Sequence, residues 1–178
     1  MIHQNHVKAL ELEEKAIKEA CGKGTTRIFI LSSMYLDAGS YCMKLLKLEQ
    51  ALDYIEKSVN ILVQTQMQYS PNGIYTMTTY AKLLYHQGKF PEAARIFTSC
   101  ISITDKVYEY DTLTKGYLFQ NLAAVHTSMR NEKVALMYYA QAESIFQKFL
   151  DEEHPDLLTC KEQRGNLIEG QKVDLLEE

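Results

Sequence analysis

Residues 83–97 read LLYHQGKFPEAARIF, and this stretch decides the fold. Gly88 can adopt the positive φ that ends an α-helix, and Pro91, which lacks a backbone N–H, suits the first turn of the next helix. Apolar residues recur at helical spacing on both sides of this turn. The stretch therefore predicts two helices joined by a tight turn, with Phe90 packed inward.

Small residues recur along the chain with a period of 42. One series is Gly39, Ala81, Ala123 and Gly165, and a second is Ala9, Ala51, Ala93 and Ala135. A large apolar residue follows four positions after the later alanines, as at Ile55, Phe97 and Tyr139. Antiparallel helices approach closely where one presents a small side chain and the other fills the space. Each repeat is therefore predicted to be a helical hairpin.

The composition favours an all-α chain. Only 3 prolines and 8 glycines are available for turns among 178 residues, which suits a few long helices better than many short strands. At this length a single domain buries enough surface to fold without disulfides or a structural metal. We expect one domain over residues 1–178, built from about eight helices.

Three stretches resemble the tetratricopeptide repeat (TPR). The first match is carried by Ala81, Gly88, Phe90, Ala93 and Phe97, the second lies in NLAAVHTSMRNEKVALMYYAQA (residues 121–142), and the third in DAGSYCMKLLKLEQALDYIEKS (residues 37–58). Glu132 and Leu48 stand where the family usually has an aromatic residue. The resemblance implies a right-handed superhelical solenoid of antiparallel helix hairpins.

The period is longer than the common TPR unit of about 34 residues, and the longer unit resembles the repeats of kinesin light chains. The turn DEEHPD, residues 151–156, is especially similar to that family's inter-repeat turn, and Ser70-Pro71-Asn72 lies two periods earlier. This register predicts a half repeat at 3–21, full repeats at about 25–67, 72–108 and 112–150, and a half repeat with a polar cap at 155–178. Such a chain is either a complete small protein or a fragment of a longer array.

Charge and hydropathy narrow the function classes. Residues 1–150 hold 16 Lys and Arg against 14 Asp and Glu, whereas residues 151–178 hold 3 against 9. No basic stripe is present to neutralise phosphates, so nucleic-acid binding is not expected. No apolar run approaches the length that spans a bilayer, and the first twenty residues lack the apolar core of a signal peptide. We expect a cytoplasmic protein without membrane insertion.

The sequence offers no catalytic, cofactor or metal site. The cysteines (Cys21, Cys42, Cys100 and Cys160) are too widely spaced for a metal site and are expected to be free, buried thiols. His126 is expected in the core, bonded to a neighbour, and the pair His3 and His6 lacks further ligands. His154-Pro155-Asp156, also a loop motif of J-domain co-chaperones, is interpreted as a repeat turn because acidic residues precede it.

The TPR register implies a concave groove lined by the first helix of each hairpin, suited to a peptide or a partner helix. The groove positions are Ser33, Leu36, Ser40 and Lys44, then Tyr75, Thr78, Lys82 and Tyr85, then Tyr117, Gln120, Asn121, Ala124 and Thr127, and finally Thr159, Glu162 and Asn166. Lys82 and Asn121 are expected to reach one extended ligand with an acidic residue. Tyr75, Tyr85 and Tyr117 favour binding, because exposed aromatic residues are otherwise a solubility liability.

Three functions remain open from the sequence. The first is a non-enzymatic scaffold or adaptor that binds a peptide or helical segment in the groove. The second is an accessory or regulatory TPR domain of a larger multidomain enzyme or of a motor or organelle-transport protein. The third is self-association through the end helices.

Overall fold

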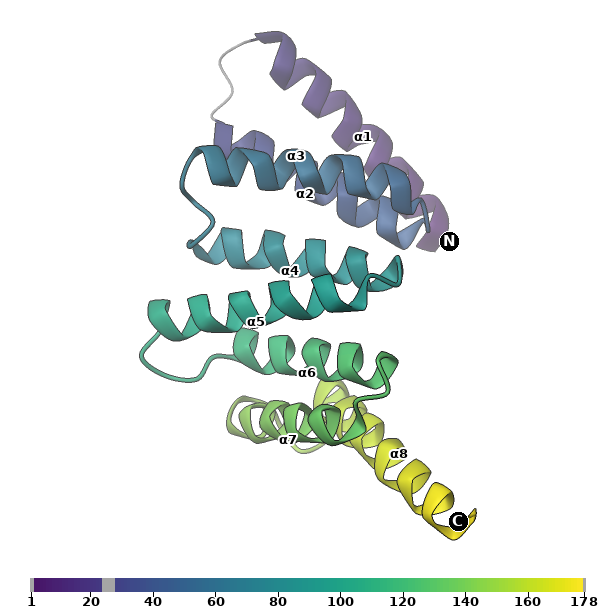
Figure 1. The fold of residues 1–178 in the computed structure, drawn as a ribbon. Helices are drawn as coiled ribbons and strands as arrows, with labels where there is room; N and C mark the ends of the chain where they lie inside the picture. Colours follow the sequence, from purple (N-terminus) through teal and green to yellow (C-terminus); the bar gives the residue numbers. More distant parts are fainter. Residues whose placement is uncertain (1, 24–27, 178) are drawn as a thin grey trace. The chain divides into compact units, whose positions relative to one another are not determined.

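The computed structural model describes residues 2–23 and 28–177, and these described residues form eight α-helices and no strand (Figure 1). The helices are α1 (Ile2–Lys23), α2 (Ile28–Lys44), α3 (Leu48–Gln64), α4 (Pro71–His86), α5 (Phe90–Val107), α6 (Leu113–Ser128), α7 (Glu132–Phe149) and α8 (Pro155–Glu177). The prediction of an all-α chain of about eight helices is confirmed.

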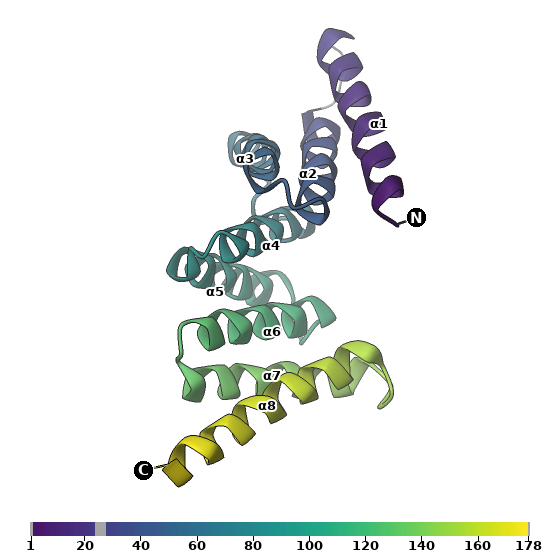
Figure 2. The ribbon, with the colours of Figure 1, turned by 90° about the vertical axis from the view of Figure 1, so that its right-hand side faces the viewer.

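The chain divides into two compact units, Met1–Lys89 and Phe90–Glu178. In the first unit α2 packs between α1 and α3, and α4 packs on α3 (Figure 2). In the second unit α6 packs between α5 and α7, and α8 packs on α7. The boundary lies inside the predicted repeat at 72–108, so a single domain over the whole chain stays a prediction.

Three helices begin with a side-chain cap at the 42-residue period. The Ser70 hydroxyl accepts a hydrogen bond from the Gly73 N–H at the start of α4, at 3.1 Å. The Thr112 hydroxyl accepts one from the Lys115 N–H at the start of α6, at 3.2 Å. At the start of α8, His154 Nδ1 accepts one from the Asp156 N–H, at 3.2 Å. Each cap satisfies an orphan N–H of the first helical turn, which confirms the interpretation of His154 as a turn residue.

Three first helices end in the same left-handed turn, again 42 residues apart. Leu46, Gly88 and Arg130 have φ values of 59°, 75° and 58°. After each, the next N–H bonds back to the carbonyl five positions earlier, as from Lys89 to Leu84 at 2.9 Å. This is the Schellman arrangement. The positive φ expected at Gly88 is confirmed, and the two other copies carry side chains at a position that favours glycine.

Small residues mark the close helix contacts. A Cβ added to Gly39 would lie 2.5 Å from Ile55, and one added to Gly116 would lie 2.7 Å from Phe146. Ala51, Ala93 and Ala135 are fully buried. Gly165 differs from the rest of its series, because nothing lies within 4 Å of an added Cβ there. The predicted small series is therefore required for packing at Gly39 but not at Gly165.

Some burial expectations need correction. Phe90 is half-buried. Cys21 is exposed rather than buried, the other three cysteines are buried, and none of the four forms a disulfide. Leu10 of α1 is buried in the core of the first unit, with Leu12 on the same helix exposed. Over the described part of the chain, no helix contains an apolar stretch of the length needed to span a bilayer.

Candidate functional site

A hollow of about 200 Å³ lies between α2 and α4 in the first unit. We call it the α2–α4 hollow. Its lining residues come from α2, the end of α3, the following loop and the first turns of α4: Ser32, Ser33, Leu36, Asp37, Leu62, Met67, Asn72, Tyr75 and Thr76. Three of the predicted groove positions, Ser33, Leu36 and Tyr75, therefore meet at one site.

Hydrogen bonds fix the helices around the hollow. Ser32 on α2 and Ser58 on α3 are buried, and their hydroxyls lie 2.9 Å apart. Ser58 also donates to the Ser32 carbonyl at 2.8 Å, which ties α2 to α3. The Thr76 hydroxyl donates to the Asn72 carbonyl at 2.9 Å within α4. These hydrogen bonds fix the helices that line the hollow, and among them Asn72 contributes only its backbone carbonyl.

The hollow combines apolar and polar lining residues. Leu36 and Leu62 are only 6% and 4% exposed and supply apolar surface. Asp37 and Asn72 are exposed and polar, and Tyr75 is 60% exposed. Leu36, a predicted groove position, lines the hollow, although neighbouring side chains cover most of its surface. The site has the make-up of a small recognition pocket, apolar inside with polar groups at the edge.

The electrostatics of the hollow are acidic. Partial burial raises the pKa of the Asp37 carboxyl above its usual value. The pKa of Glu13 on α1 is also raised, first by burial and then by the charge of Asp37. Within the described residues, no lysine, arginine or histidine forms an ion pair with either carboxylate. Among the described residues, the Asp37 carboxylate at the hollow therefore has no cationic partner.

The equivalent place in the second unit is filled. Two periods after Ser33, Leu62 and Asn72 stand Tyr117, Phe146 and Asp156. The Tyr117 ring packs on the Phe146 ring with centroids 5.0 Å apart, and its hydroxyl donates to the Asp156 carboxylate. This hydrogen bond, together with burial and the carboxylate charge, raises the pKa of Tyr117 to about 12.

Two further predicted groove residues of the second unit are bonded within the chain. The Gln120 side chain on α6 donates to the Gln163 side chain on α8 at 3.2 Å. The Asn121 amide donates to the Tyr117 carbonyl on its own helix at 2.6 Å. Tyr117 is half-buried, so the expectation that it is an exposed aromatic residue is wrong. In the second unit these side chains therefore form hydrogen bonds within α6 and between α6 and α8.

The remaining predicted groove residues are scattered over both units. Lys44, Lys82, Glu162 and Asn166 are exposed, and Thr78, Tyr85 and Thr127 are half-buried. Desolvation of the Lys82 ammonium lowers its pKa, although the residue as a whole is exposed. Lys82 and Asn121 belong to different units, so their contact with one ligand stays a prediction.

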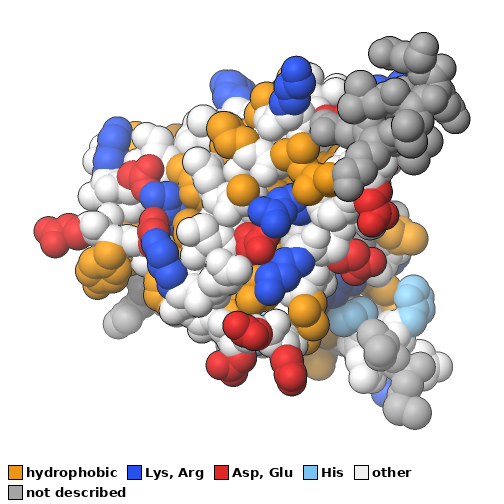
Figure 3. Space-filling model, turned by 90° about the horizontal axis from the view of Figure 1, so that it is seen from below, with side chains coloured by type: hydrophobic (Ala, Val, Ile, Leu, Met, Phe, Trp, Pro, Cys, Tyr) orange, Lys and Arg blue, Asp and Glu red, His pale blue; other side chains and the backbone are white. Residues whose placement is uncertain are grey.

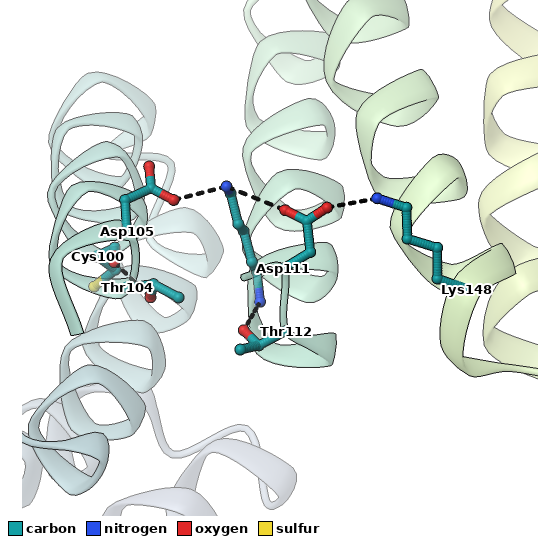
Figure 4. A network of polar contacts seen from close by, with 7 residues as sticks. Cys100, Thr104, Asp105, Asp111, Thr112 and Lys148 are labelled. Carbon is teal, nitrogen blue, oxygen red and sulfur yellow. Dashed lines mark hydrogen bonds and ion pairs between the residues drawn. The ribbon is translucent and has the colours of Figure 1, made fainter. Parts of the chain in front are cut away.

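A charged network ties three elements of the second unit together (Figure 4). The Lys115 ammonium lies 2.7 Å from Asp105 on α5 and 3.4 Å from Asp111 in the α5–α6 loop. Asp111 in turn lies 2.6 Å from Lys148 on α7. These bonds lower the pKa of Asp111, the bond from Lys148 most of all. Each of these charges is therefore paired within the second unit.

Other polar groups show no convergent chemistry. His126 Nδ1 is buried and has no hydrogen-bond partner among the described residues, contrary to the expected bond to a neighbour, and its ring stacks on Tyr138. Burial lowers the pKa of His126. No group of three or more potential metal ligands gathers in the described part of the chain. The face shown in Figure 3 intersperses basic, acidic and hydrophobic side chains.

Asp37, Leu62, Met67 and Asn72 were not identified as site residues from the sequence. A comparison of positions 84 residues apart, which is twice the period, would have indicated the site. Ser33 is small where Tyr117 is large, and Leu62 is smaller than Phe146. Two reductions in size at neighbouring positions of the fold indicate missing volume. That interpretation becomes visible only once the helices are known to enclose one place.

The fold has clear relatives of distant sequence. No protein-family model matches the sequence, and no curated protein matches it. BtubC from P. vanneervenii superposes with a TM-score of 0.84 at 15% identity, over 94% of this chain and 67% of that chain. A putative kinesin light chain of Podosopora anserina with nearly identical TPR-like repeats superposes with a TM-score of 0.76 at 19% identity, over 98% and 85%.

A further match is a Rap conjugation gene regulator of the plasmid pLS20, solved with the Phr* peptide. It superposes with a TM-score of 0.67 at 16% identity, over 96% of this chain and 50% of that chain. At such identities the likeness establishes the fold alone. The expected TPR resemblance is confirmed at that level, and the chain has a TPR-like fold shared with kinesin light chain-like repeat proteins.

Proposed function

We propose that this chain is a non-enzymatic protein-interaction scaffold that holds a peptide or helical segment against α2 and α4 of the first unit. The observation that carries the proposal is the α2–α4 hollow, which stands open where the second unit fills the equivalent place with Tyr117. The solvent-exposed Tyr75 beside it offers an aromatic contact of the kind enriched in interaction hot spots.

The fold supports this function by analogy. TPR-like repeats use the faces of paired helices to hold peptides, and the Rap regulator of similar fold was solved in complex with the Phr* peptide. A soluble scaffold of this kind needs no cofactor, and its location is expected to be the cytoplasm. Self-association through α1 or α8 is the alternative binding mode that the same experiment separates.

The test is a selection from a displayed library of random peptides against the full chain. Tyr75→Ala should weaken the selected peptides at least tenfold, because it removes the exposed ring at the hollow. Tyr110→Ala, an exposed tyrosine of the second unit, is the matched control and should leave affinity unchanged. Selected peptides that bind both variants as tightly as the unmodified chain would refute the α2–α4 surface as the binding site.

Size-exclusion chromatography coupled to light scattering accompanies the selection. A chain that forms dimers or larger assemblies, and whose peptide binding follows substitutions on α1 or α8 instead of Tyr75, would favour the end helices as the functional surface.

A further inference from the structure

The carboxylate at the α2–α4 hollow differs from its counterpart in a chemically informative way. Asp37 stands two periods before Asn121, whose amide donates to the Tyr117 carbonyl on the same helix. An ionised aspartate has no proton to donate, so it cannot make the same bond to the Ser33 carbonyl. Asp37 instead contributes to the wall of the hollow.

The second unit shows what the hollow accommodates. There, an apolar ring reaches the place and ends in a hydroxyl that donates to the Asp156 carboxylate. The first unit has Asn72 in place of Asp156 and adds the Asp37 carboxylate to the lining, so an occupant with an apolar body and a terminal hydrogen-bond donor finds acceptors there. Tyrosine, lysine and arginine side chains all meet this description.

Charge distinguishes between these occupants. Glu13 and Asp37 repel each other and have no cationic partner among the described residues. A neutral phenol leaves that repulsion in place, whereas an ammonium or guanidinium group cancels it and forms a charge-assisted hydrogen bond. Leu36, Leu62 and Met67 supply the apolar surface along which a long basic side chain packs its stem.

The first unit already contains a cation held in this manner. The Lys57 ammonium lies 5.7 Å and 5.6 Å from the ring centroids of Tyr35 and Tyr54, and 2.6 Å from the Asp53 carboxylate. The hollow offers the same two kinds of group, a tyrosine ring at Tyr75 and a carboxylate at Asp37. A basic side chain placed there finds a ring and a carboxylate together.

We infer that the α2–α4 hollow is a subsite for a lysine or arginine side chain of the bound peptide. The inference rests on the proposed function, since it specifies which residue of the ligand enters this site. It assigns Asp37 as the residue that selects the basic side chain, with Glu13 reinforcing the negative potential.

The experiment uses the peptides selected from the random library on the full chain. Their sequences should be enriched in lysine or arginine at one position. Changing that residue to glutamine should weaken binding at least tenfold, measured by fluorescence anisotropy of the labelled peptide. On Asp37→Asn the same pair of peptides should differ less than twofold, whereas Glu56→Gln, an exposed carboxylate on α3 away from the hollow, should preserve the tenfold difference.

Ser33→Tyr provides an independent test, because it introduces the ring that fills the equivalent place in the second unit. It should abolish preference for the basic residue while the helical circular dichroism stays unchanged. Ser102→Tyr on the exposed surface of α5 controls for the added ring.

The possible failures are distinguishable. Enrichment of aromatic or acidic residues in peptides that Ser33→Tyr blocks would overturn the cationic subsite and keep the α2–α4 surface as a binding site. Selected peptides that ignore Tyr75→Ala and Ser33→Tyr alike would overturn the proposed function itself. A tenfold difference that persists on Asp37→Asn would overturn the role of that carboxylate.

Discussion

The α2–α4 region of the first unit and the α6–α8 region of the second are built on the same register but finished differently. In both, a capped helix packs on the preceding second helix, and the two caps, Ser70 and His154, lie two 42-residue periods apart. In the second unit Tyr117 fills the space over Phe146 and bonds to Asp156. In the first unit Ser33, Leu62 and Asn72 leave a hollow of about 200 Å³.

This difference shows how two repeats with the same backbone register come to have a closed or an open contact between helices. One large side chain closes the contact between two first helices, and its replacement by serine opens it without altering the backbone register. The sizes of neighbouring side chains are also matched within each unit. Gly116 makes room for Phe146. The equivalent residue Ser32 stands near the smaller Leu62 and forms a hydrogen bond with Ser58. Each unit is therefore packed consistently around its own choice of side chains.

The largest effect is expected from opening the closed region. Tyr117→Ser removes a ring that packs on fully buried Phe146 and leaves the Asp156 carboxylate without its donor. We expect a loss of about 2 to 3 kcal/mol of stability, less than for a fully buried aromatic residue because Tyr117 is half-buried. Urea denaturation followed by far-ultraviolet circular dichroism measures it. An unchanged midpoint would mean that the ring does not support the second unit.

The next largest change in stability is expected at the left-handed turns that precede the second helices. Leu46 and Arg130 adopt positive φ with a side chain, whereas Gly88 does so without one. Leu46→Gly and Arg130→Gly should each stabilise the chain by about 0.5 to 1 kcal/mol, and Gly88→Ala should destabilise it by about 1 kcal/mol. Thermal melts of the three variants provide the measurement. The change in stability should have one sign for the two substitutions to glycine and the opposite sign for Gly88→Ala. A loss of stability in all three variants would contradict the argument from backbone strain.

Closing the open region should have a smaller effect on stability. Ser33→Tyr with Asn72→Asp supplies the ring and the carboxylate that the second unit has at these positions. We expect a gain of about 0.5 to 1 kcal/mol, limited because Leu62 offers the ring less surface than Phe146 does. The urea midpoint reports this gain, and the single variant Asn72→Asp serves as its control. A marked loss would show that the hollow is too small for the ring.

The last expected effect appears only at alkaline pH. Because the bond to Asp156 raises the pKa of Tyr117 from 10.0 to about 12, the folded state keeps this proton where the unfolded state loses it. The contribution of Tyr117 is therefore complete below pH 10 and fades as the pH rises toward 12. Tyr117→Phe should show a shallower fall in stability across that interval than the unmodified chain. Parallel curves for the two proteins would exclude this linkage.

Local signals in the sequence predicted most of the backbone. Gly88 marks the turn because glycine adopts positive φ without a side-chain penalty, and Pro91 marks it because the proline ring fixes φ. Both residues lie within a few positions of the helices that they separate. The alanine series at 51, 93 and 135 predicted the close helix contacts, because small residues at a fixed period are needed wherever antiparallel helices touch. These features depend on near neighbours or on the period, and both can be extracted from one sequence.

The candidate binding site could be predicted only in part from such signals. Ser33 and Tyr75 were predicted to line a groove, but Leu36 is buried and Tyr117, Gln120 and Asn121 are bonded within the chain. Whether a polar or aromatic side chain is available to a ligand depends on what packs against it. Those neighbours come from other helices and do not follow from helical periodicity.

By itself, the sequence determined an all-α chain of repeated helix hairpins, with turns at Gly88, at residues 70–72 and at residues 154–156, and with buried alanines at positions 51, 93 and 135. Only the tertiary structure decided that Ser33, Leu62 and Asn72 enclose an open hollow lined by Asp37, while the same positions two repeats later are closed by Tyr117. The physical reason is that secondary structure follows from short-range conformational preferences. A cavity is instead the volume left by side chains of three separate helices, and its size is fixed only when they pack together.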